Sequence, residues 1–263
     1  MPVIQITELW LPYPGQDDRL VRVFVPAHED GETFPVIYMT DGSNLFDEET
    51  STYGCWHTRE SVRAERELSG QAAIIVGIHN DDSDQRTNEL TPKTIGTLLP
   101  SRHLEKEPVP LGEIFDAFTV NTVMPAVEAR FPVKKGRKNT AFCGSSSGGL
   151  QAFFTALSHP DKFCAAGVLS PAFLLYSEED MSRWIHRKIQ LDMPYLYLYT
   201  GAGDELEKDI YEGVERTYDI LLECYPMHLL NEIVLLEQKH HETAWEPVFR
   251  DFLHTFLTRR NEF

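Results

Sequence analysis

The sequence predicts an α/β protein in which a mostly parallel sheet is covered by helices on both faces. Short apolar runs alternate with helical patterns along the chain, as expected for successive βαβ units. One run, Ala72–Ile78, is continuously apolar, as expected for a parallel strand that is buried on both faces. The length of 263 residues suits one domain, residues 1–263, because no linker rich in Pro, Gly or Ser divides it.

The first half of the chain begins with an expected antiparallel pair of strands. Val3–Leu11 and Leu20–Val25 are rich in apolar residues and flank a turn at residues 14–18. Residues 93–112 show little periodicity, and a loop of that length is more often functional than accidental. The other elements expected in this half are the strands Phe34–Thr40 and Ala72–Ile78 and the helices Ser61–Leu68 and Glu113–Phe131, the last of them kinked or restarted at Pro125.

The second half repeats the alternation, so the complete sheet should contain about eight strands. Each strand expected here is short and apolar, and a helical pattern follows it. These strands are Asn139–Cys143, Ala165–Ser170, Pro194–Thr200 and Ile233–Leu236. The chain closes with an amphipathic helix that includes Trp245 and Phe256.

The segment Gly144–Gly149 carries the pattern Gly-x-Ser-x-Gly, with Ser146 at its centre. In a nucleophile elbow the central serine occupies a sharp turn between a strand and a helix, and the flanking glycines let the chain reverse. A short apolar run upstream predicts the strand, and Leu150, Phe153 and Leu157 downstream fall at helical spacing. A flexible linker would also be rich in Gly and Ser, but this context favours the elbow.

A nucleophilic serine needs a histidine base, and the base needs a carboxylate to orient it. The chain supplies both after Ser146, in the order serine, acid, histidine. Asp204 follows the third strand of the second half, and its neighbour Glu205 is the alternative acid. His240 follows the last strand, and His241 is the alternative base. A metal site at this histidine pair is disfavoured because no HxxxH or Cys/His spacing accompanies it.

An oxyanion hole needs two backbone N–H groups aimed at the developing charge. Ser147, the residue after the nucleophile, should supply one, and Ser43, in the loop after the third strand, is the candidate for the other. The aromatic side chains near the site are as compatible with the core as with a substrate platform. The substrate pocket is expected to include the 93–112 excursion and the residues Asn44, Trp56, Arg86 and Phe173.

Composition limits the partners and the compartment. The chain has 24 Lys and Arg against 41 Asp and Glu, a formal net charge of −17. Phosphate backbones would be repelled, so nucleic acid and anionic membranes are not expected as partners, and highly anionic substrates are disfavoured. The 4 cysteines show no CxxC spacing, and no secretory signal or membrane-spanning run stands out. We therefore expect free thiols and a cytoplasmic protein.

From about residue 18 to its end, the chain resembles the esterase family that includes enterochelin esterases, feruloyl and acetylxylan esterases, and S-formylglutathione hydrolases. The segment His240–Trp245 is similar to the family's H-N-E-x-x-W ending, in which the first His is catalytic. This favours His240, and His241 stands where the family often has Asn. The other segments that carry the resemblance are Pro35–Asp47, Gly77–Asn80, Arg86–Pro92, the elbow, and Ser170–Phe173.

The resemblance implies an α/β-hydrolase fold without a large separate cap domain. The enterochelin-esterase-like branch is closest, because the segment Asn80–Pro92 is typical of it. Asp204 resembles the acid of the family's G-x-x-D pattern, although some members use Glu in this loop. The family's oxyanion donors correspond to Ser43 and Ser147. The substrate does not carry over, because many substrates share this fold and triad.

The sequence thus predicts a serine carboxylic-ester hydrolase with a Ser-His-Asp triad, which forms an acyl-enzyme from a small acyl or aryl ester. No metal or organic cofactor is required. Two alternatives are acyl transfer to an alcohol on the same triad, and a catalytically silent protein that kept the scaffold. The acyl and alcohol groups and the oligomeric state are not determined by the sequence.

Overall fold

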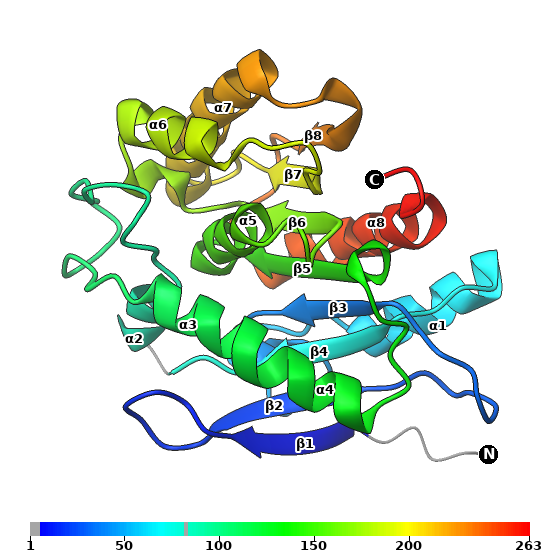
Figure 1. Ribbon diagram of the computed structural model, residues 1–263. Coiled ribbons are helices and arrows are strands. Elements are labelled where there is room, and N and C mark those ends of the chain that lie inside the picture. The colour runs from blue at the N-terminus through cyan, green and yellow to red at the C-terminus, as the bar shows by residue number, and fades with distance from the viewer. Residues whose placement is uncertain (1–5, 82–83) are drawn as a thin grey trace.

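One mixed sheet of 8 strands organises the computed structural model, which describes residues 6–81 and 84–263 (Figure 1). The strand order is β1-β2-β4-β3-β5-β6-β7-β8. β2 runs antiparallel to β1 and to β4, and the other neighbouring pairs are parallel. The strands are Ile6–Leu11 (β1), Arg19–Phe24 (β2), Val36–Met39 (β3), Ile74–Ile78 (β4), Thr140–Ser145 (β5), Ala165–Leu169 (β6), Tyr195–Thr200 (β7) and Leu230–Val234 (β8).

The parallel strands end at nearly the same level, which places the loops that follow them side by side. Ser145, the last residue of β5, is paired with Leu169 at the end of β6. Leu169 is in turn paired with Tyr199, next to the end of β7. The chain therefore leaves these strands at one edge of the sheet, where α/β folds build their ligand sites.

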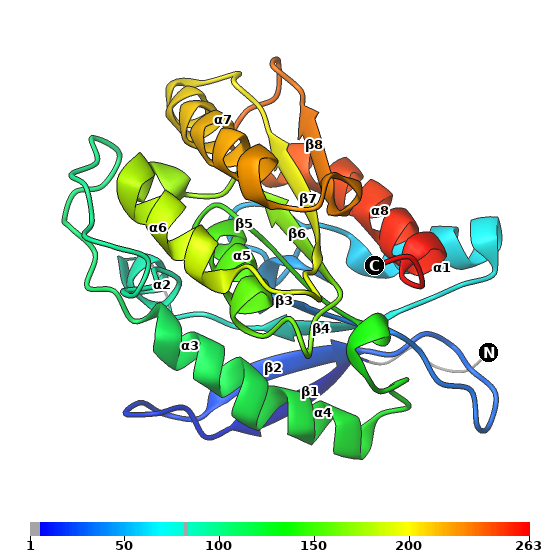
Figure 2. The same cartoon turned by 45° about the horizontal axis from the view of Figure 1, so that its top comes forward.

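Helices cover both faces of the sheet (Figures 1 and 2). α1 and α8 pack against each other on one face, whereas α3 to α7 lie on the other. The helices are Thr58–Ser69 (α1), Asp84–Glu89 (α2), Gly112–Phe118 (α3), Met124–Arg130 (α4), Ser147–Ser158 (α5), Glu178–Lys188 (α6), Glu205–Cys224 (α7) and Glu242–Arg259 (α8).

The central strands form the core. Every residue of β4 and of β6 is buried, because helices cover these strands from both sides. The apolar run Ala72–Ile78 therefore contains a buried strand, as predicted, although only its last 5 residues form β4. This strand is parallel to β3 but antiparallel to β2.

The helix predicted at Glu113–Phe131 forms as three joined segments. α3 ends at Phe118, a π-helical turn (η2, Thr119–Val123) follows, and α4 begins at Met124. Pro125 lies in the first turn of α4, directly after the π-helical turn, and a wider turn of this kind accommodates an interruption of the regular hydrogen-bond ladder. The sequence predicts a kink or a new start at this proline, and a new α-helical segment begins one residue before it.

One helix was not predicted, and one strand is displaced from its predicted position. The polar segment Asp84–Glu89 shows no apolar periodicity, yet it forms α2. The last strand, β8, spans Leu230–Val234 rather than Ile233–Leu236, because its pairing with β7 begins earlier. The first residues of the strand predicted at Val3–Leu11, up to residue 5, lie outside the described part of the chain.

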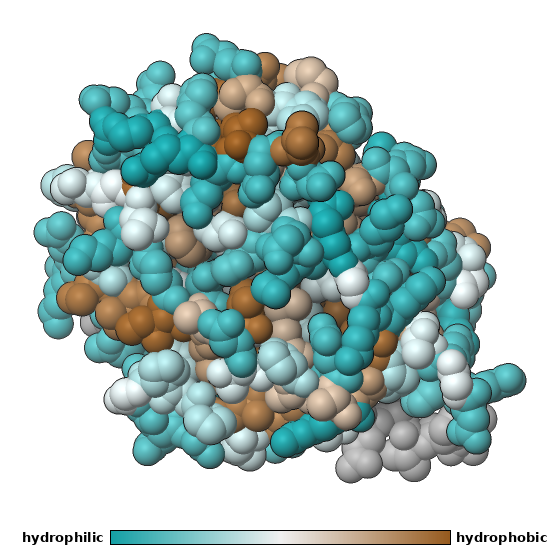
Figure 3. Space-filling model, viewed as in Figure 1, coloured by the Kyte–Doolittle hydropathy of each residue, from teal (hydrophilic) through white to brown (hydrophobic). Residues whose placement is uncertain are grey.

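The face of the molecule in Figure 3 is largely polar, because hydrophilic side chains cover most of it. This agrees with a composition in which 25% of the residues are charged. None of the helices in the described ranges combines the length and the apolar character needed to cross a bilayer.

Candidate active site

Ser146 occupies the turn between β5 and α5. Its φ of 60° and ψ of −125° lie outside the regions that non-glycine residues favour. The Ser146 N–H donates to the Leu169 carbonyl at 2.9 Å, and the Ala172 N–H donates to the Ser146 carbonyl at 3.1 Å. Ser146 is partly exposed, whereas the residues on either side of it are buried. The backbone thus has the geometry of a nucleophile elbow.

Gly144 and Gly148 flank Ser146 because neither position has room for a Cβ atom. A Cβ on Gly148 would lie 2.2 Å from Thr40 Oγ1, and a Cβ on Gly144 would lie 2.4 Å from the Gly148 carbonyl oxygen. Thr40 directly follows β3. The elbow is therefore packed tightly against the neighbouring strand of the sheet.

A histidine and a carboxylate extend from Ser146 in a hydrogen-bonded chain. His240, in the loop after β8, has its Nε2 2.9 Å from Ser146 Oγ and its Nδ1 2.5 Å from Glu207 Oε2. An ionised carboxylate can only accept, so Nδ1–H donates to Glu207 and Nε2 accepts from the serine hydroxyl. The His240 side chain is 12% exposed and that of Glu207 is 0% exposed. In this arrangement the histidine can withdraw the serine proton.

Glu207 lies in the first turn of α7 and is surrounded by donors. Its Oε1 accepts from Ser170 Oγ at 2.5 Å, from the Gly201 N–H at 2.8 Å and from Thr200 Oγ1 at 3.4 Å. Such donors stabilise a negative charge at a site that water does not reach. The second oxygen, Oε2, is left to face His240.

The predicted acid, Asp204, does not contact the His240 ring, so the prediction of its position in the triad is wrong. Asp204 caps α7: its Oδ1 accepts from the Glu207 N–H at 2.8 Å, and its Oδ2 accepts from the His240 backbone N–H at 2.9 Å. Partial burial acts to raise the pKa of Asp204, but these hydrogen bonds outweigh it and hold the pKa below its usual value. The alternative, Glu205, is exposed and pairs with Lys208 at 2.8 Å.

The sequence contains a signal for both carboxylates, the pattern Asp-x-x-Glu at residues 204–207. This is a variant of the capping box, which predicts that the first side chain binds the N–H of the fourth residue. With Asp204 occupied by the cap, Glu207 is the carboxylate that can turn toward the histidine. Glu207 lies outside the loop after β7, in which the acid was expected, because it already belongs to α7.

Trp245 of α8, which the sequence analysis named only in the closing helix and in the H-N-E-x-x-W ending, also lies at the site. Its ring meets the His240 ring edge to face, with 4.9 Å between centroids and an interplanar angle of 89°. Its Nε1–H donates to Ser170 Oγ at 2.9 Å, and Ser170 donates to Glu207. Trp245 thus supports both partners of the histidine–carboxylate pair.

The two predicted oxyanion donors lie on neighbouring loops. Ser147 is the first residue of α5, and an N–H group at this position has no acceptor within its own helix. Ser43 lies in the short 3-10 turn Gly42–Asn44 (η1) that follows β3, the neighbour of β5 in the sheet. Both groups therefore lie at the sheet edge that carries Ser146.

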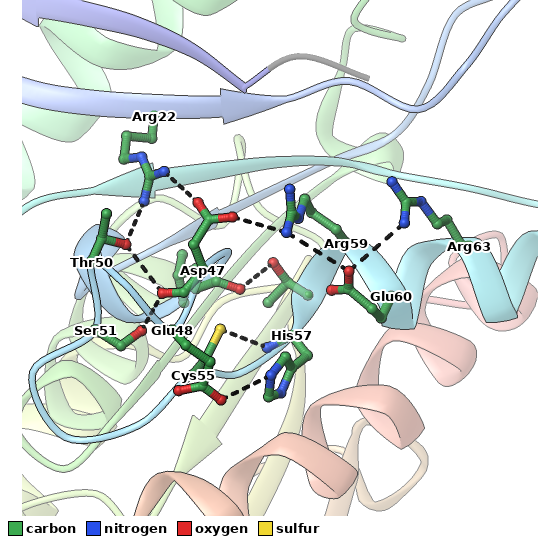
Figure 4. Close-up of polar contacts among 12 residues, drawn as sticks. Arg22, Asp47, Glu48, Thr50, Ser51, Cys55, His57, Arg59, Glu60 and Arg63 are labelled. Atoms are coloured by element: carbon green, nitrogen blue, oxygen red, sulfur yellow. Dashed lines mark hydrogen bonds and ion pairs between the residues drawn. The ribbon is translucent and has the colours of Figure 1, made fainter. Parts of the chain in front are cut away.

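Polar contacts hold the segment that follows η1, residues 45–57 (Figure 4). Arg22 of β2 donates to Asp47 Oδ2 at 2.7 Å and to Thr50 Oγ1 at 3.0 Å. Thr50 Oγ1 in turn donates to the Ser43 carbonyl at 2.8 Å. These contacts connect the candidate oxyanion donor Ser43 to β2 through Thr50 and Arg22.

The excursion predicted at residues 93–112 extends at the sheet edge where β3 and β5 end (Figure 1). Asp209 of α7 accepts from Arg102 Nε and from Arg102 Nη2, each at 2.9 Å. His103 Nε2 lies 2.7 Å from the same carboxylate. The excursion is therefore fastened to α7, the helix whose first turn carries Glu207.

Comparison with protein families identifies the class of protein. A family model described as Putative esterase matches residues 15–196. The chain belongs to the Putative esterase family. This esterase-family chain is 31% identical over 186 residues to the siderophore triacetylfusarinine C esterase of Aspergillus fumigatus. The match covers 65% of this chain and 57% of the Aspergillus protein, so the chain spans little more than half the length of that relative.

Solved structures of other proteins share the fold. Siderophore hydrolase EstA from Aspergillus nidulans superposes with a TM-score of 0.73 and 20% identity, over 98% of this chain and 95% of that one. The enterobactin esterase FES from Shigella flexneri gives a TM-score of 0.73 and 17% identity, over 100% of this chain and 61% of that one. These structures confirm the predicted α/β-hydrolase fold. The family model confirms the resemblance to the esterase family.

Two of the predicted substrate contacts are core residues instead. Trp56 and Phe173 are each 2% exposed. The Trp56 ring lies 6.1 Å from that of Trp245, and the Phe173 ring lies 4.9 Å from that of Phe153. These rings leave almost no surface for a substrate, so this part of the prediction is corrected.

The other two predicted contacts, Asn44 and Arg86, lie at the correct sheet edge but already bind protein groups. Asn44 is buried, and its Oδ1 accepts from the Thr52 N–H at 3.2 Å and from Ser43 Oγ at 3.1 Å. Arg86 has a side chain that is 25% exposed, and it forms an ion pair with Asp41. A contact of either with a substrate stays a prediction.

The cysteines offer no competing nucleophile. All 4 are free thiols, and Cys55, Cys143 and Cys164 are buried. Burial raises the pKa of Cys164 to about 11 and that of Cys143 further still, so these thiols keep their protons at neutral pH. Across residues 6–81 and 84–263, no group of three His, Cys, Asp or Glu side chains is arranged to hold a metal ion.

Proposed function

We propose that the protein hydrolyses carboxylic esters, with Ser146 as the nucleophile, His240 as the base and Glu207 as the orienting acid. The observation that carries this proposal is the chain of contacts from Ser146 Oγ through His240 to Glu207, at 2.9 Å and 2.5 Å. Membership of the Putative esterase family supports the reaction class. The scheme needs neither a metal nor an organic cofactor.

In the first half of the reaction, Ser146 Oγ attacks the ester carbonyl while His240 Nε2 takes its proton. Glu207 stabilises the imidazolium that forms. The N–H groups of Ser147 and Ser43 donate to the carbonyl oxygen as it becomes negative. The imidazolium then protonates the leaving alcohol, and the acyl group stays on the serine.

In the second half, a water molecule replaces the alcohol. His240 takes a proton from this water as the water attacks the acyl carbonyl. The same N–H groups stabilise the second tetrahedral intermediate. This intermediate collapses to a carboxylic acid as the bond to Ser146 Oγ breaks, and the His240 imidazolium returns its proton to Ser146 Oγ. One base therefore serves both steps, because Nε2 is the ring atom that faces the serine in the resting site.

We propose an ester of the siderophore type as the substrate. The named relatives support this class: one is called a siderophore triacetylfusarinine C esterase, and one structure was determined in the presence of enterobactin. Incubating the protein with each of these two esters and following the products by mass spectrometry tests the substrate class. If the protein cleaves simple esters but neither siderophore, the proposed substrate class is wrong and only the proposed ester hydrolysis remains.

The reaction type is tested by hydrolysis of p-nitrophenyl acetate and butyrate by the wild type, Ser146→Ala and His240→Ala. We expect turnover by the wild type and near-complete loss in both variants, because members of a triad act as a unit. The ratio of kcat/KM for the acetate and the butyrate then indicates the size of the acyl pocket. If the folded wild type neither hydrolyses these esters nor reacts with a fluorophosphonate, the proposal is wrong and the catalytically silent scaffold is the better description.

We also propose that the protein works in the cytoplasm. Its 4 cysteines are free thiols, which is the state that a reducing compartment maintains. Fractionating the cells that produce it, with detection by an antibody, tests this location. Recovery of the protein outside the cytoplasm would overturn it.

A further inference from the structure

We propose that the Asp41–Arg86 ion pair is a positioning device, which holds the loop of the oxyanion donor Ser43 against the nucleophile elbow. In this role Arg86 acts through Asp41 and the backbone and does not recognise the substrate. The inference rests on the proposed ester hydrolysis and adds positioning residues to that site.

The first observation is the backbone at Asp41. This residue joins β3 to η1, and its φ of 56° and ψ of 46° place it in the left-handed region. A non-glycine residue in this region is strained and keeps its conformation only when its surroundings enforce it. The strained residue lies two positions before Ser43, so its conformation directs the loop that carries the candidate oxyanion donor.

The second observation is the number of donors on the Asp41 carboxylate. Arg86 Nε donates to Oδ1 at 2.5 Å, and Arg86 Nη2 donates to Oδ2 at 2.9 Å. Asn80 Nδ2 donates to Oδ1 at 2.7 Å, and Thr40 Oγ1 donates to Oδ2 at 3.0 Å. A planar guanidinium bound to both oxygens fixes orientation as well as distance. These contacts supply the restraint that the strained backbone requires.

The third observation is that Arg86 reaches the nucleophile strand as well. Its Nη2 donates to the carbonyl of Ser145, the residue before the nucleophile, at 3.3 Å. One side chain of α2 therefore bridges the loop after β3 and the end of β5. Through its contacts with Asp41 and Ser145, Arg86 fixes the position of the Ser43 loop relative to the nucleophile Ser146.

Close packing next to the ion pair couples the loop after β3 to the nucleophile elbow. A Cβ placed on Gly148 would lie 2.2 Å from Thr40 Oγ1 and 3.1 Å from Asp41 Oδ2. The Asp41 carboxylate therefore lies in contact with the first turn of α5, which begins at Ser147. A displacement of Asp41 would be transmitted to both candidate oxyanion donors.

The charges of the pair fit positioning better than substrate binding. The side chains of Arg86 and Asp41 are 25% and 13% exposed, so both charges are largely withdrawn from water. Each then depends on the other, because an unpaired charge in such a place is strongly destabilising. An Arg86 that released Asp41 to hold a substrate would leave that carboxylate without its main partner.

The test measures kcat and KM for p-nitrophenyl acetate in Arg86→Ala, Arg86→Lys and the matched control Arg137→Ala. Arg137 precedes β5 at the opposite end of the strand and donates to the carbonyls of Pro160, Met193 and Phe263. Its removal should lower Tm without changing kcat. For both Arg86 variants we expect kcat to fall by roughly 10²-fold, the effect of misplacing reacting groups by about 1 Å, with KM changed less than about 3-fold.

Chemical rescue adds a readout that general destabilisation would not change. In Arg86→Ala, 50 mM methylguanidinium should raise kcat several-fold, because a guanidinium can again bind both Asp41 oxygens, whereas 50 mM NaCl should not. Arg86→Lys keeps the charge and supports folding, but it cannot restore the bidentate contact. We expect no rescue of Arg137→Ala.

Two outcomes overturn the inference, and a third concerns the proposed function. A large rise in KM with unchanged kcat in the Arg86 variants would show that Arg86 binds the substrate. An equal loss of kcat in Arg137→Ala would show that any destabilised variant behaves in this way. If the wild type does not hydrolyse esters at all, the proposed function fails first and this role fails with it.

Discussion

At the scale of single residues, two carboxylates near the start of α7 bind different parts of His240. Glu207 binds the ring at Nδ1, and Asp204 binds the backbone N–H of the same residue. The first contact selects the tautomer that leaves Nε2 free to accept a proton. The second only restrains the loop, so the two side chains should differ greatly in their effect on catalysis.

We predict that Glu207→Gln lowers kcat/KM for p-nitrophenyl acetate by roughly 10³–10⁴-fold, since an amide no longer enforces the productive tautomer. Asp204→Asn should lower it by less than about 10-fold, because Asn remains a good helix cap. The pair is compared by steady-state kinetics, with Tm as the check on folding. A larger loss in Asp204→Asn than in Glu207→Gln would restore Asp204 as the triad acid.

At the scale of elements, the contact between the end of β3 and the start of α5 is tight. We predict that Gly148→Ala lowers the free energy of unfolding by roughly 1–3 kcal/mol, because its Cβ would overlap Thr40 Oγ1. The double variant Gly148→Ala/Thr40→Ala should recover part of that loss, since it removes the overlapping atom. Urea unfolding of the single and double variants measures both effects, and strictly additive losses would contradict the clash.

The packing of β8 on α7 contains a carboxylate with a raised pKa. Burial, with repulsion from Glu215 and Asp219, raises the pKa of Glu232 from 4.5 to about 7. The folded state therefore binds this proton more tightly than the unfolded chain does. Ionisation of Glu232 thus destabilises the fold increasingly as the pH rises from about 4.5 to about 7, and fully above that range.

We predict that Glu232→Gln raises Tm by roughly 2 °C at pH 8, and that the gain fades as the pH is lowered toward 5. Glu237→Gln, at an exposed position beyond the same strand, is the control and should show little change at either pH. Thermal unfolding followed by circular dichroism at both pH values measures the difference. A gain that is equal at pH 5 and pH 8 would show that the raised pKa is not its cause.

At the scale of the whole molecule, the formal net charge of −17 acts on every approaching substrate. Near the site, Arg86 of α2 is paired with Asp41, so it does little to offset the surrounding negative field. Long-range repulsion of this kind is screened by salt. The charge of the substrate should therefore determine how its kcat/KM responds to ionic strength.

We predict that kcat/KM for p-nitrophenyl hemisuccinate, which carries a carboxylate, rises several-fold between roughly 10 and 300 mM NaCl. The value for neutral p-nitrophenyl acetate should change little and serves as the control. Parallel initial-rate series provide the measurement. A fall for the anionic ester with added salt would reveal a local positive site that attracts it.

The sequence by itself determined the features that depend on local pattern. The continuous apolar run that contains β4 indicates a strand buried on both faces. Gly144 and Gly148, which have no Cβ atom, indicate the sharp turn that exposes Ser146 at the end of the strand. The order of the strands along the chain also placed His240 at the correct edge. These conclusions needed only neighbouring residues and the direction of the chain.

Only the tertiary structure decided which side chains meet across that edge. Glu207 and His240 are 33 residues apart, and whether Asp204, Glu205 or Glu207 reaches the ring depends on how α7 begins and which carboxylate its N-terminal N–H groups take up. Likewise, Trp56 and Phe173 are placed in the core by the packing of helices on the sheet. Composition describes the residues of a loop, whereas the direction of each side chain is set by contacts with elements distant in sequence.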